Sequence, residues 1–296
     1  MTNLNGFDLG IIGDRINPGF KSTKVLFDND DIAGIQALAV KQVDAGAKYL
    51  DVNVGARGEA DAALVAKVTR AIQAVVTVPL CFDSQSAQVQ EIYLKTYDRA
   101  RAGGAPPLVN SITEHRWDLM DLYRPLGPFK VIVMASERVE GGIAKGNKTA
   151  EEISSTARRA ALRLLKDYRM PMEDVFIDIS VSAVIADTIG LHRATLEAIC
   201  TIRNDPDLRG IHIMGGLTNI GQQLPTKAAD GSDLKLSLEC AFLTLAVPLG
   251  FDTVLATPWR GYRALPTDNY VLVAYKNFLE QNGSNALRAV RKFYKM

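Results

Sequence analysis

Short apolar runs alternate with longer amphipathic segments along most of the chain. The apolar runs have the length and the valine and isoleucine content of strands, and the segments between them repeat apolar residues at helical spacing. Eight strands are expected, over residues 9–17, 49–55, 79–84, 107–113, 130–136, 175–180, 210–216 and 253–258. Helices are expected over residues 30–45, 60–75, 87–99, 149–168, 192–204 and 234–249, with one or two more between 267 and 294.

The clearest helical pattern lies at residues 149–168. Thr149 and Glu152 have the spacing of a capping box, in which each side chain bonds the other residue's backbone N–H. Ile153, Ala157 and Leu164 follow at helical spacing, so one face of this segment is apolar.

Strands that alternate with helices predict a parallel sheet covered by helices. With eight such units, the pattern predicts a single (β/α)8 TIM barrel in one domain over residues 1–296. A doubly wound open sheet is the rival architecture. It would be favoured by a GxGxxG motif after the first strand, but the sequence there is GIIGDRINPG.

Polar residues stand at the carboxyl ends of the expected strands. In YLDVNVG, Val52 and Val54 alternate with Asp51 and Asn53, although a strand between helices should be buried on both faces. In a barrel, alternate side chains point inward and the ligand binds at the carboxyl ends of the strands. The polar residues expected around that mouth are Asp14, Arg15, Asn17, Asp51, Asn53, Asp83, Asn110, Ser136, Glu137, Arg138, Asp178 and Asn219.

This set is rich in acids and amides and contains no histidine. A phosphate site would need clustered basic residues or a glycine-rich turn, and a metal site would need close carboxylates or histidines. Acids and amides can instead donate and accept several hydrogen bonds to one neutral ligand. The set suits a flat polar heterocycle, because an aspartate can accept parallel bonds from an amidine-like N–H/NH2 pair.

The motifs that carry these residues resemble a known family. They are GDRIN (13–17), DVNVG (51–55), FDS (82–84), NS (110–111), IDIS (177–180) and GLTNIGQ (216–222). In this order they resemble the pterin-binding methyltransferases that exchange a methyl group between tetrahydrofolate and a corrinoid protein. The folate module of cobalamin-dependent methionine synthase is a relative. Two positions depart from the family pattern. The family has Glu where this chain has Asp14, and Pro where this chain has Ile179.

The resemblance implies roles for individual residues. Asp83, Asn110 and Asp178 match positions that hydrogen-bond the pterin ring, and Asn219 matches the catalytic amide that approaches N5 of the folate. A second shell could be formed by Asp14, Arg15, Asn17, Asp51 and Asn53. As an alternative, Asp51 and Asn53 only pair with Arg15 and cap strand ends.

The resemblance also implies the substrates and partners. Tetrahydrofolate or 5-methyltetrahydrofolate would be the small-molecule substrate, and the site would hold no metal of its own. Cobalamin is expected on a separate corrinoid protein, since the DxHxxG pattern of corrinoid sites is missing from the sequence. A homodimer is implied as well. The direction of methyl transfer, the upstream methyl donor and the preferred folate glutamylation stay open.

Two other functions remain possible at this stage. A dihydropteroate-synthase-like enzyme shares the barrel and the pterin pocket, but it would need a basic residue and a Ser/Lys motif near the seventh strand, where this chain has GGLTNIGQQLP. A non-catalytic folate-binding barrel is the second alternative, against which Asn219 argues.

Composition and charge restrict the remaining classes. The formal net charge is +1, which argues against a nucleic-acid surface or a basic membrane anchor. We expect a cytoplasmic protein, because no signal-peptide pattern or membrane-length apolar run is evident. The three cysteines, Cys81, Cys200 and Cys240, are far apart and are expected to be reduced, with Cys81 in the core.

Several other segments have two interpretations. Lys21 and Lys24 could attract a folate tail or an acidic partner, but a solvated loop is favoured. Glu137 and Arg138 could contribute to the mouth or form a local ion pair. Residues 258–263, PWRGYR, could be an interface or a packed loop. His115, His192 and His212 are scattered, which argues against metal ligation.

Overall fold

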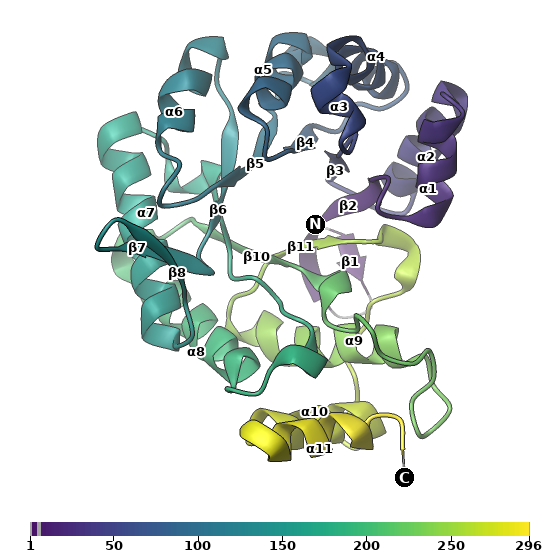
Figure 1. Cartoon of the computed structure of the whole chain (residues 1–296), viewed down its shortest axis with the longest axis vertical. Coiled ribbons are helices and arrows are strands. Elements are labelled where there is room, and N and C mark those ends of the chain that lie inside the picture. The colour runs from purple at the N-terminus through teal and green to yellow at the C-terminus, as the bar shows by residue number, and fades with distance from the viewer. Residues whose placement is uncertain (1, 5–6, 296) are drawn as a thin grey trace.

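A closed parallel barrel forms the centre of the structure, a computed structural model that describes residues 2–4 and 7–295 (Figure 1). Within these residues, eight parallel strands follow one another around the barrel in chain order, and the first pairs with the second to close the ring. They are β2 (Phe7–Ile16), β3 (Tyr49–Val52), β4 (Leu80–Asp83), β5 (Leu108–Ile112), β6 (Lys130–Met134), β9 (Val175–Asp178), β10 (His212–Gly216) and β11 (Thr253–Ala256).

Helices connect the strands and surround the barrel, so the expected (β/α)8 TIM barrel is confirmed (Figure 1). None of the helices in the described ranges is long and apolar enough to cross a membrane. The helices are α1 (Lys21–Asp28), α2 (Ile32–Asp44), α3 (Arg57–Ala60), α4 (Ala62–Gln73), α5 (Ala87–Thr96), α6 (Asp118–Tyr123), α7 (Ala150–Tyr168), α8 (Leu191–Asn204), α9 (Leu234–Ala246), α10 (Tyr270–Leu279) and α11 (Gly283–Lys292).

Helix α7 begins with the predicted capping box. The Thr149 hydroxyl accepts a hydrogen bond from the Glu152 backbone N–H at 3.2 Å, and the Glu152 carboxylate accepts one from the Thr149 backbone N–H at 3.2 Å. These bonds satisfy donors that a helix start otherwise leaves unpaired.

Apolar side chains fill the barrel on both faces of its strands, as parallel sheets between helices require. The larger cluster lies between the strands and the helices, and the smaller one fills the barrel interior. Cys81 is fully buried in the interior cluster, as expected for a small core residue. The interior cluster consists of Ile12, Cys81, Leu108, Ile132, Phe176 and Met214, with Tyr49 and Leu255 packed against it.

Two elements differ from the sequence predictions. The segment containing Lys21 and Lys24 is helix α1, so the expected loop was wrong, although both lysines are exposed to solvent as expected. Lys24 pairs with Asp28 one turn later at 2.6 Å. A β-hairpin that was not predicted follows β6, formed by β7 (Glu137–Glu140) and β8 (Ile143–Gly146). Its turn places both central glycines at positive φ, 61° at Gly141 and 79° at Gly142, as tight hairpin turns require.

Candidate functional site

The inner face of the barrel changes from apolar to polar two residues beyond the interior cluster. Because strand side chains alternate, residue i+2 points to the same side as residue i. Cys81 is therefore followed on the inner face by Asp83, and Phe176 by Asp178. The same step along the other strands leads to Asp14, Asp51, Asn110, Met134, Gly216 and Thr257. Asp51 and Asn53 can therefore occur in an otherwise buried strand, because they belong to the part of it that lies at the barrel mouth.

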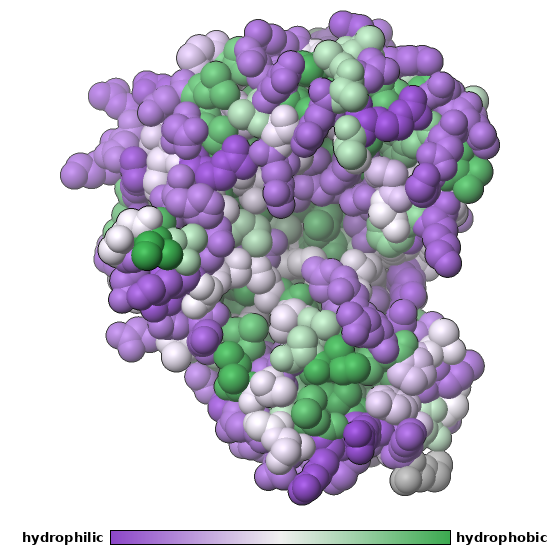
Figure 2. All heavy atoms as spheres, viewed as in Figure 1, coloured by the Kyte–Doolittle hydropathy of each residue, from purple (hydrophilic) through white to green (hydrophobic). Residues whose placement is uncertain are grey.

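A cavity of about 500 Å³ opens at this mouth. Figure 2 shows the face that carries the β7–β8 hairpin, and this face is hollowed at its centre, over the barrel strands. The volume is within the range of small-molecule sites. The cavity is lined by Asp83, Ser84, Gln85, Asn110, Ser111, Thr113, His115, Arg116, Met134, Ser136, Glu137 and Asp178.

Asp83 is held in place by Asn53. The Asn53 Nδ2 atom donates a hydrogen bond to Asp83 Oδ2 at 2.9 Å, and Asn53 Oδ1 accepts one from the Gly55 N–H at 2.7 Å. Asn53 is therefore fixed at both ends of its amide and fixes one oxygen of Asp83. Burial raises the pKa of Asp83, while the bond from Asn53 lowers it.

Asp51 is a buried acid on β3, the strand beside the one that carries Asp83. Its side chain is only 1% exposed, and its Oδ1 atom has no hydrogen-bond partner among the described residues. Burial, and next the charge of Asp83, raise the pKa of Asp51 well above its ordinary value. No ion pair joins Asp51 to Arg15 within residues 7–295, so the alternative in which Asp51 pairs with Arg15 was wrong.

Asp178, at the end of β9, is a second buried acid in the cavity lining. Its Oδ1 atom accepts a hydrogen bond from the Ser180 N–H at 2.6 Å, which orients the carboxyl group. Burial raises the pKa of Asp178 to about 6, and the Ser180 bond lowers it. Near neutral pH, Asp178 is thus a desolvated carboxylate with room to accept hydrogen bonds from a ligand.

Gln90 joins the ends of two site strands, and the sequence analysis missed it. From helix α5, its Nε2 atom donates to the backbone oxygens of Phe82 at 2.6 Å and Asn110 at 2.9 Å. It also approaches the Ser84 oxygen at 3.2 Å. A glutamine on a helix gives no sequence signal for this role, because its burial, at 1% exposure, arises only from tertiary packing.

Replacing Gln90 with leucine is expected to destabilise the protein by about 3 kcal/mol, because buried carbonyl oxygens at the ends of β4 and β5 lose their donor. Urea unfolding followed by circular dichroism measures this change. Gln88→Leu on the exposed side of the same helix is the matched control and should change stability little. Equal stability of the two variants would contradict the bridging role.

Asn219 follows β10 but does not line the cavity. It ends a single 3-10 turn at Leu217–Asn219 and is exposed. Its Oδ1 atom accepts a hydrogen bond from Gln222 Nε2 at 2.7 Å, which directs the NH2 group as the remaining donor. Gly216 leaves space for this amide, since an added Cβ there would lie 3.1 Å from Asn219 Nδ2.

The expected second-shell residues Asp14 and Arg15, on β2, and Asn17, just after it, have partners outside the cavity lining. Asp14 is 5% exposed and accepts a hydrogen bond from the Thr257 hydroxyl at 2.9 Å. The Arg15 guanidinium lies 3.7 Å from the centre of the Phe20 ring, a cation–π contact. Asn17 accepts a hydrogen bond from the Gly19 N–H at 2.8 Å and so stabilises the turn before α1.

The two charged segments that had two interpretations, around Arg138 and at PWRGYR, form ion pairs within the protein. Arg138 pairs with Glu140 at 3.0 Å and Glu152 at 2.9 Å rather than with Glu137, which lines the cavity. The PWRGYR stretch contributes Arg260, whose Nε atom lies 3.4 Å from a Glu239 carboxylate oxygen, and Tyr262, which is fully buried.

Histidines do not assemble a metal site in the described part of the chain. His192 is buried between the Tyr275 hydroxyl, at 2.7 Å, and the Ser182 carbonyl oxygen, at 2.9 Å. Among residues 2–4 and 7–295, no group of three or more His, Cys, Asp or Glu side chains could hold a metal ion.

Comparison with known proteins shows the family to which the sequence is similar. The model of the family described as pterin binding enzyme matches residues 16–256. A curated protein of Eubacterium limosum, methylcorrinoid:tetrahydrofolate methyltransferase, is 25% identical over 255 residues, which cover 84% of each chain.

Solved dihydropteroate synthases have a similar fold. The enzyme from Stenotrophomonas maltophilia has a TM-score of 0.58 and 16% identity, covering 86% of this chain and 89% of that chain. The enzyme from Thermus thermophilus has a TM-score of 0.55 and 19% identity, covering 88% of this chain and 91% of that chain. At such identities, the likeness supports the barrel fold alone.

Proposed function

The chain belongs to the pterin binding enzyme family, and we propose that it transfers a methyl group between a methylated corrinoid protein and N5 of tetrahydrofolate. The observation that carries the proposal is that Asp83, Asn110 and Asp178, from three separate strands, line one cavity at the barrel mouth. The relative from Eubacterium limosum, whose name describes this reaction, supports it.

The acids and the amide suit the edge of a pterin ring. That edge offers neighbouring N–H and NH2 donors together with a carbonyl acceptor. Asp83 retains Oδ1 for an incoming donor because Asn53 engages only Oδ2. Asn110 can donate and accept at once, and Asp178 accepts when ionised. Bonds from ligand donors to buried carboxylates are charge-assisted and therefore strong.

Methyl transfer moves one carbon and one proton. In the direction of 5-methyltetrahydrofolate synthesis, the N5 lone pair bonds the methyl carbon, the cobalt–carbon bond breaks with both electrons left on the corrinoid, and N5 releases its proton to solvent water. In the reverse direction, a neutral N5-methyl amine leaves poorly unless hydrogen bonding or protonation draws electron density from N5. The Asn219 NH2 group is our proposed donor to N5, and rigid positioning of the pterin adds to the rate.

Tetrahydrofolate affinity is expected to decrease as the pH falls through about 6. Burial raises the pKa of Asp178 to about 6, so acid converts the accepting carboxylate into a carboxylic acid. Below that pH, affinity should fall by up to about tenfold per pH unit, because one proton competes with the ligand. Titration calorimetry between pH 5 and 8 measures the profile. Asp178→Asn should bind weakly without the inflection near pH 6; an unchanged inflection would contradict the assignment to Asp178.

An anaerobic assay with methylcobalamin and tetrahydrofolate tests the proposed function. Formation of 5-methyltetrahydrofolate together with cob(I)alamin is the expected result. Tight folate binding without any methyl transfer would instead support a folate-binding barrel. Incubation with a hydroxymethyl-dihydropterin diphosphate and p-aminobenzoate is the parallel test: dihydropteroate formation would overturn the proposal in favour of a synthase.

The proposal includes a separate corrinoid protein as the donor or acceptor of the methyl group. A homodimer and a cytoplasmic location remain predictions of the resemblance and of the sequence. Sedimentation analysis of the purified chain, alone and with a corrinoid protein, tests the dimer and the partner.

A further inference from the structure

Both acidic and basic side chains line the cavity at the barrel mouth. The acids are Asp83 at the end of β4, Asp178 at the end of β9 and Glu137 at the start of β7. The segment that follows β5 brings His115 and Arg116 to the lining. Among the twelve described residues that line the cavity, these two are the only ones with basic side chains.

Arg116 carries a positive charge, and its hydrogen bond in the structure is to an uncharged group. Its Nη1 atom donates to the Gln85 backbone oxygen at 2.8 Å, a neutral partner, and no ion pair involves it within residues 7–295. His115 differs, because its Nδ1 atom lies 3.4 Å from a Glu137 carboxylate oxygen. Arg116 is therefore the group in the lining best able to hold an anion.

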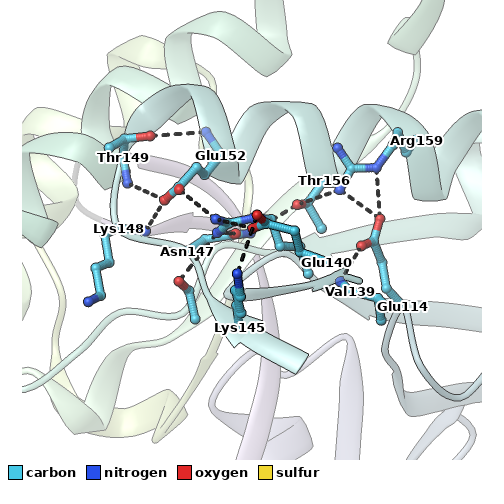
Figure 3. Close-up of polar contacts among 12 residues, drawn as sticks. Glu114, Val139, Glu140, Lys145, Asn147, Lys148, Thr149, Glu152, Thr156 and Arg159 are labelled. Atoms are coloured by element: carbon cyan, nitrogen blue, oxygen red, sulfur yellow. Dashed lines mark hydrogen bonds and ion pairs between the residues drawn. The ribbon is translucent and has the colours of Figure 1, made fainter. Parts of the chain in front are cut away.

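Glu114 fixes the segment that presents Arg116. One of its oxygens accepts a hydrogen bond from the Val139 N–H in the β7–β8 hairpin at 2.9 Å. The other accepts from Arg159 of helix α7, with Nε at 3.0 Å and Nη2 at 2.9 Å. Figure 3 shows Glu114 between these two partners. The Glu114 side chain is only 11% exposed, so this anchor is largely shielded from solvent.

We propose that Arg116 binds the carboxylate-bearing glutamate tail of the folate substrate, an inference that rests on the proposed function. A pterin ring bound to Asp83 and Asp178 directs the rest of the molecule outward. The tail carboxylates are repelled by those acids and attracted by a guanidinium, whose planar donors match a carboxylate. Because Glu114 already holds the segment that carries Arg116 in place, binding of the tail costs little conformational entropy.

The other candidate cations are less suitable. Lys21 and Lys24 lie on helix α1 and are not part of the cavity lining. Lys24 is already paired with Asp28 at 2.6 Å. Lys21 is exposed and supplies a matched control for a positive charge elsewhere on the surface.

Two ligands separate ring binding from tail binding. Tetrahydrofolate has both parts, whereas 6-methyltetrahydropterin has the ring without any carboxylate. In anaerobic titration calorimetry, Arg116→Gln should weaken tetrahydrofolate binding by about tenfold, the loss of one charge-assisted bond, and leave 6-methyltetrahydropterin affinity unchanged. The loss should diminish at high salt, where wild-type binding weakens toward that of the variant.

Three further variants test whether the charge and the position of Arg116 account for the effect. Arg116→Lys should recover part of the tetrahydrofolate affinity, because the charge is kept and the planar fork is lost. Glu114→Gln should weaken tetrahydrofolate selectively, as expected for a positioning residue. Lys21→Gln should change neither affinity.

Two results would overturn the inference. One is unchanged tetrahydrofolate affinity in Arg116→Gln, and the other is an equal loss for both ligands, which would indicate a structural role. If wild-type protein bound tetrahydrofolate but transferred no methyl group, the result would contradict the proposed methyl transfer but not the proposed tail site. If wild-type protein bound neither ligand, the proposed function would fail and this inference with it.

Discussion

Replacing Asn219 with alanine is expected to lower methyl-transfer turnover by about 100-fold while changing tetrahydrofolate affinity by less than about threefold. The amide would donate to N5 most strongly in the transition state, where the charge on that nitrogen changes, so its loss acts on the rate more than on ground-state binding. Single-turnover kinetics of 5-methyltetrahydrofolate with cob(I)alamin, the direction in which N5 gains the lone pair that can accept from the amide, give the rate, and calorimetry gives the dissociation constant.

Gln222 provides the companion variant for this experiment. It donates to Asn219 Oδ1 at 2.7 Å and so directs the Asn219 NH2 group. Gln222→Ala should leave Asn219 present but less well oriented, with a smaller loss of turnover. Because Asn219 is exposed, its removal should not alter the unfolding curve. Wild-type turnover in Asn219→Ala would refute the assigned role.

The barrel could be predicted because its strands carry two independent signals. Apolar runs such as KVIVM and VFID mark strands buried on both faces, and the helices between them repeat at their own period. The polar residues at strand ends then indicate the mouth, because parallel strands all point the same way. Asp83, Asn110 and Asp178 were found by this argument, and the cavity lining includes all three.

The features that could not be predicted from the sequence depend on tertiary contacts. Gln90 is an ordinary helical glutamine until helix α5 packs on the strand ends, and Arg116 lies in a segment with no periodic pattern. The β7–β8 hairpin has few apolar residues, so its Gly141-Gly142 turn was the one available signal. The exposed position of Asn219 outside the cavity lining was also not foreseen, since motif order says nothing about side-chain direction.

Replacing Asp83 with asparagine is expected to weaken tetrahydrofolate and 6-methyltetrahydropterin binding alike, by about 100-fold. The substitution exchanges a carboxylate acceptor for an amide that can present its NH2 group to the ligand's own donors. Loss of a charge-assisted bond in a buried site costs up to about 3 kcal/mol, or about 100-fold in affinity. Calorimetry with both ligands measures the effect, which differs from that of Arg116→Gln because the tail-free ligand is also affected.

Asp51→Asn is the matched control, since Asp51 lies on the neighbouring strand β3 but, unlike Asp83, does not line the cavity. Burial, and next the charge of Asp83, raise the pKa of Asp51 well above its ordinary value and so favour the uncharged carboxyl group. An amide of nearly the same shape should then change pterin affinity little. Equal losses in Asp51→Asn and Asp83→Asn would mean that the ionised carboxylate of Asp83 is not what the ring recognises. A large loss in Asp83→Asn alone would identify that carboxylate as the acceptor for the ring's N–H groups.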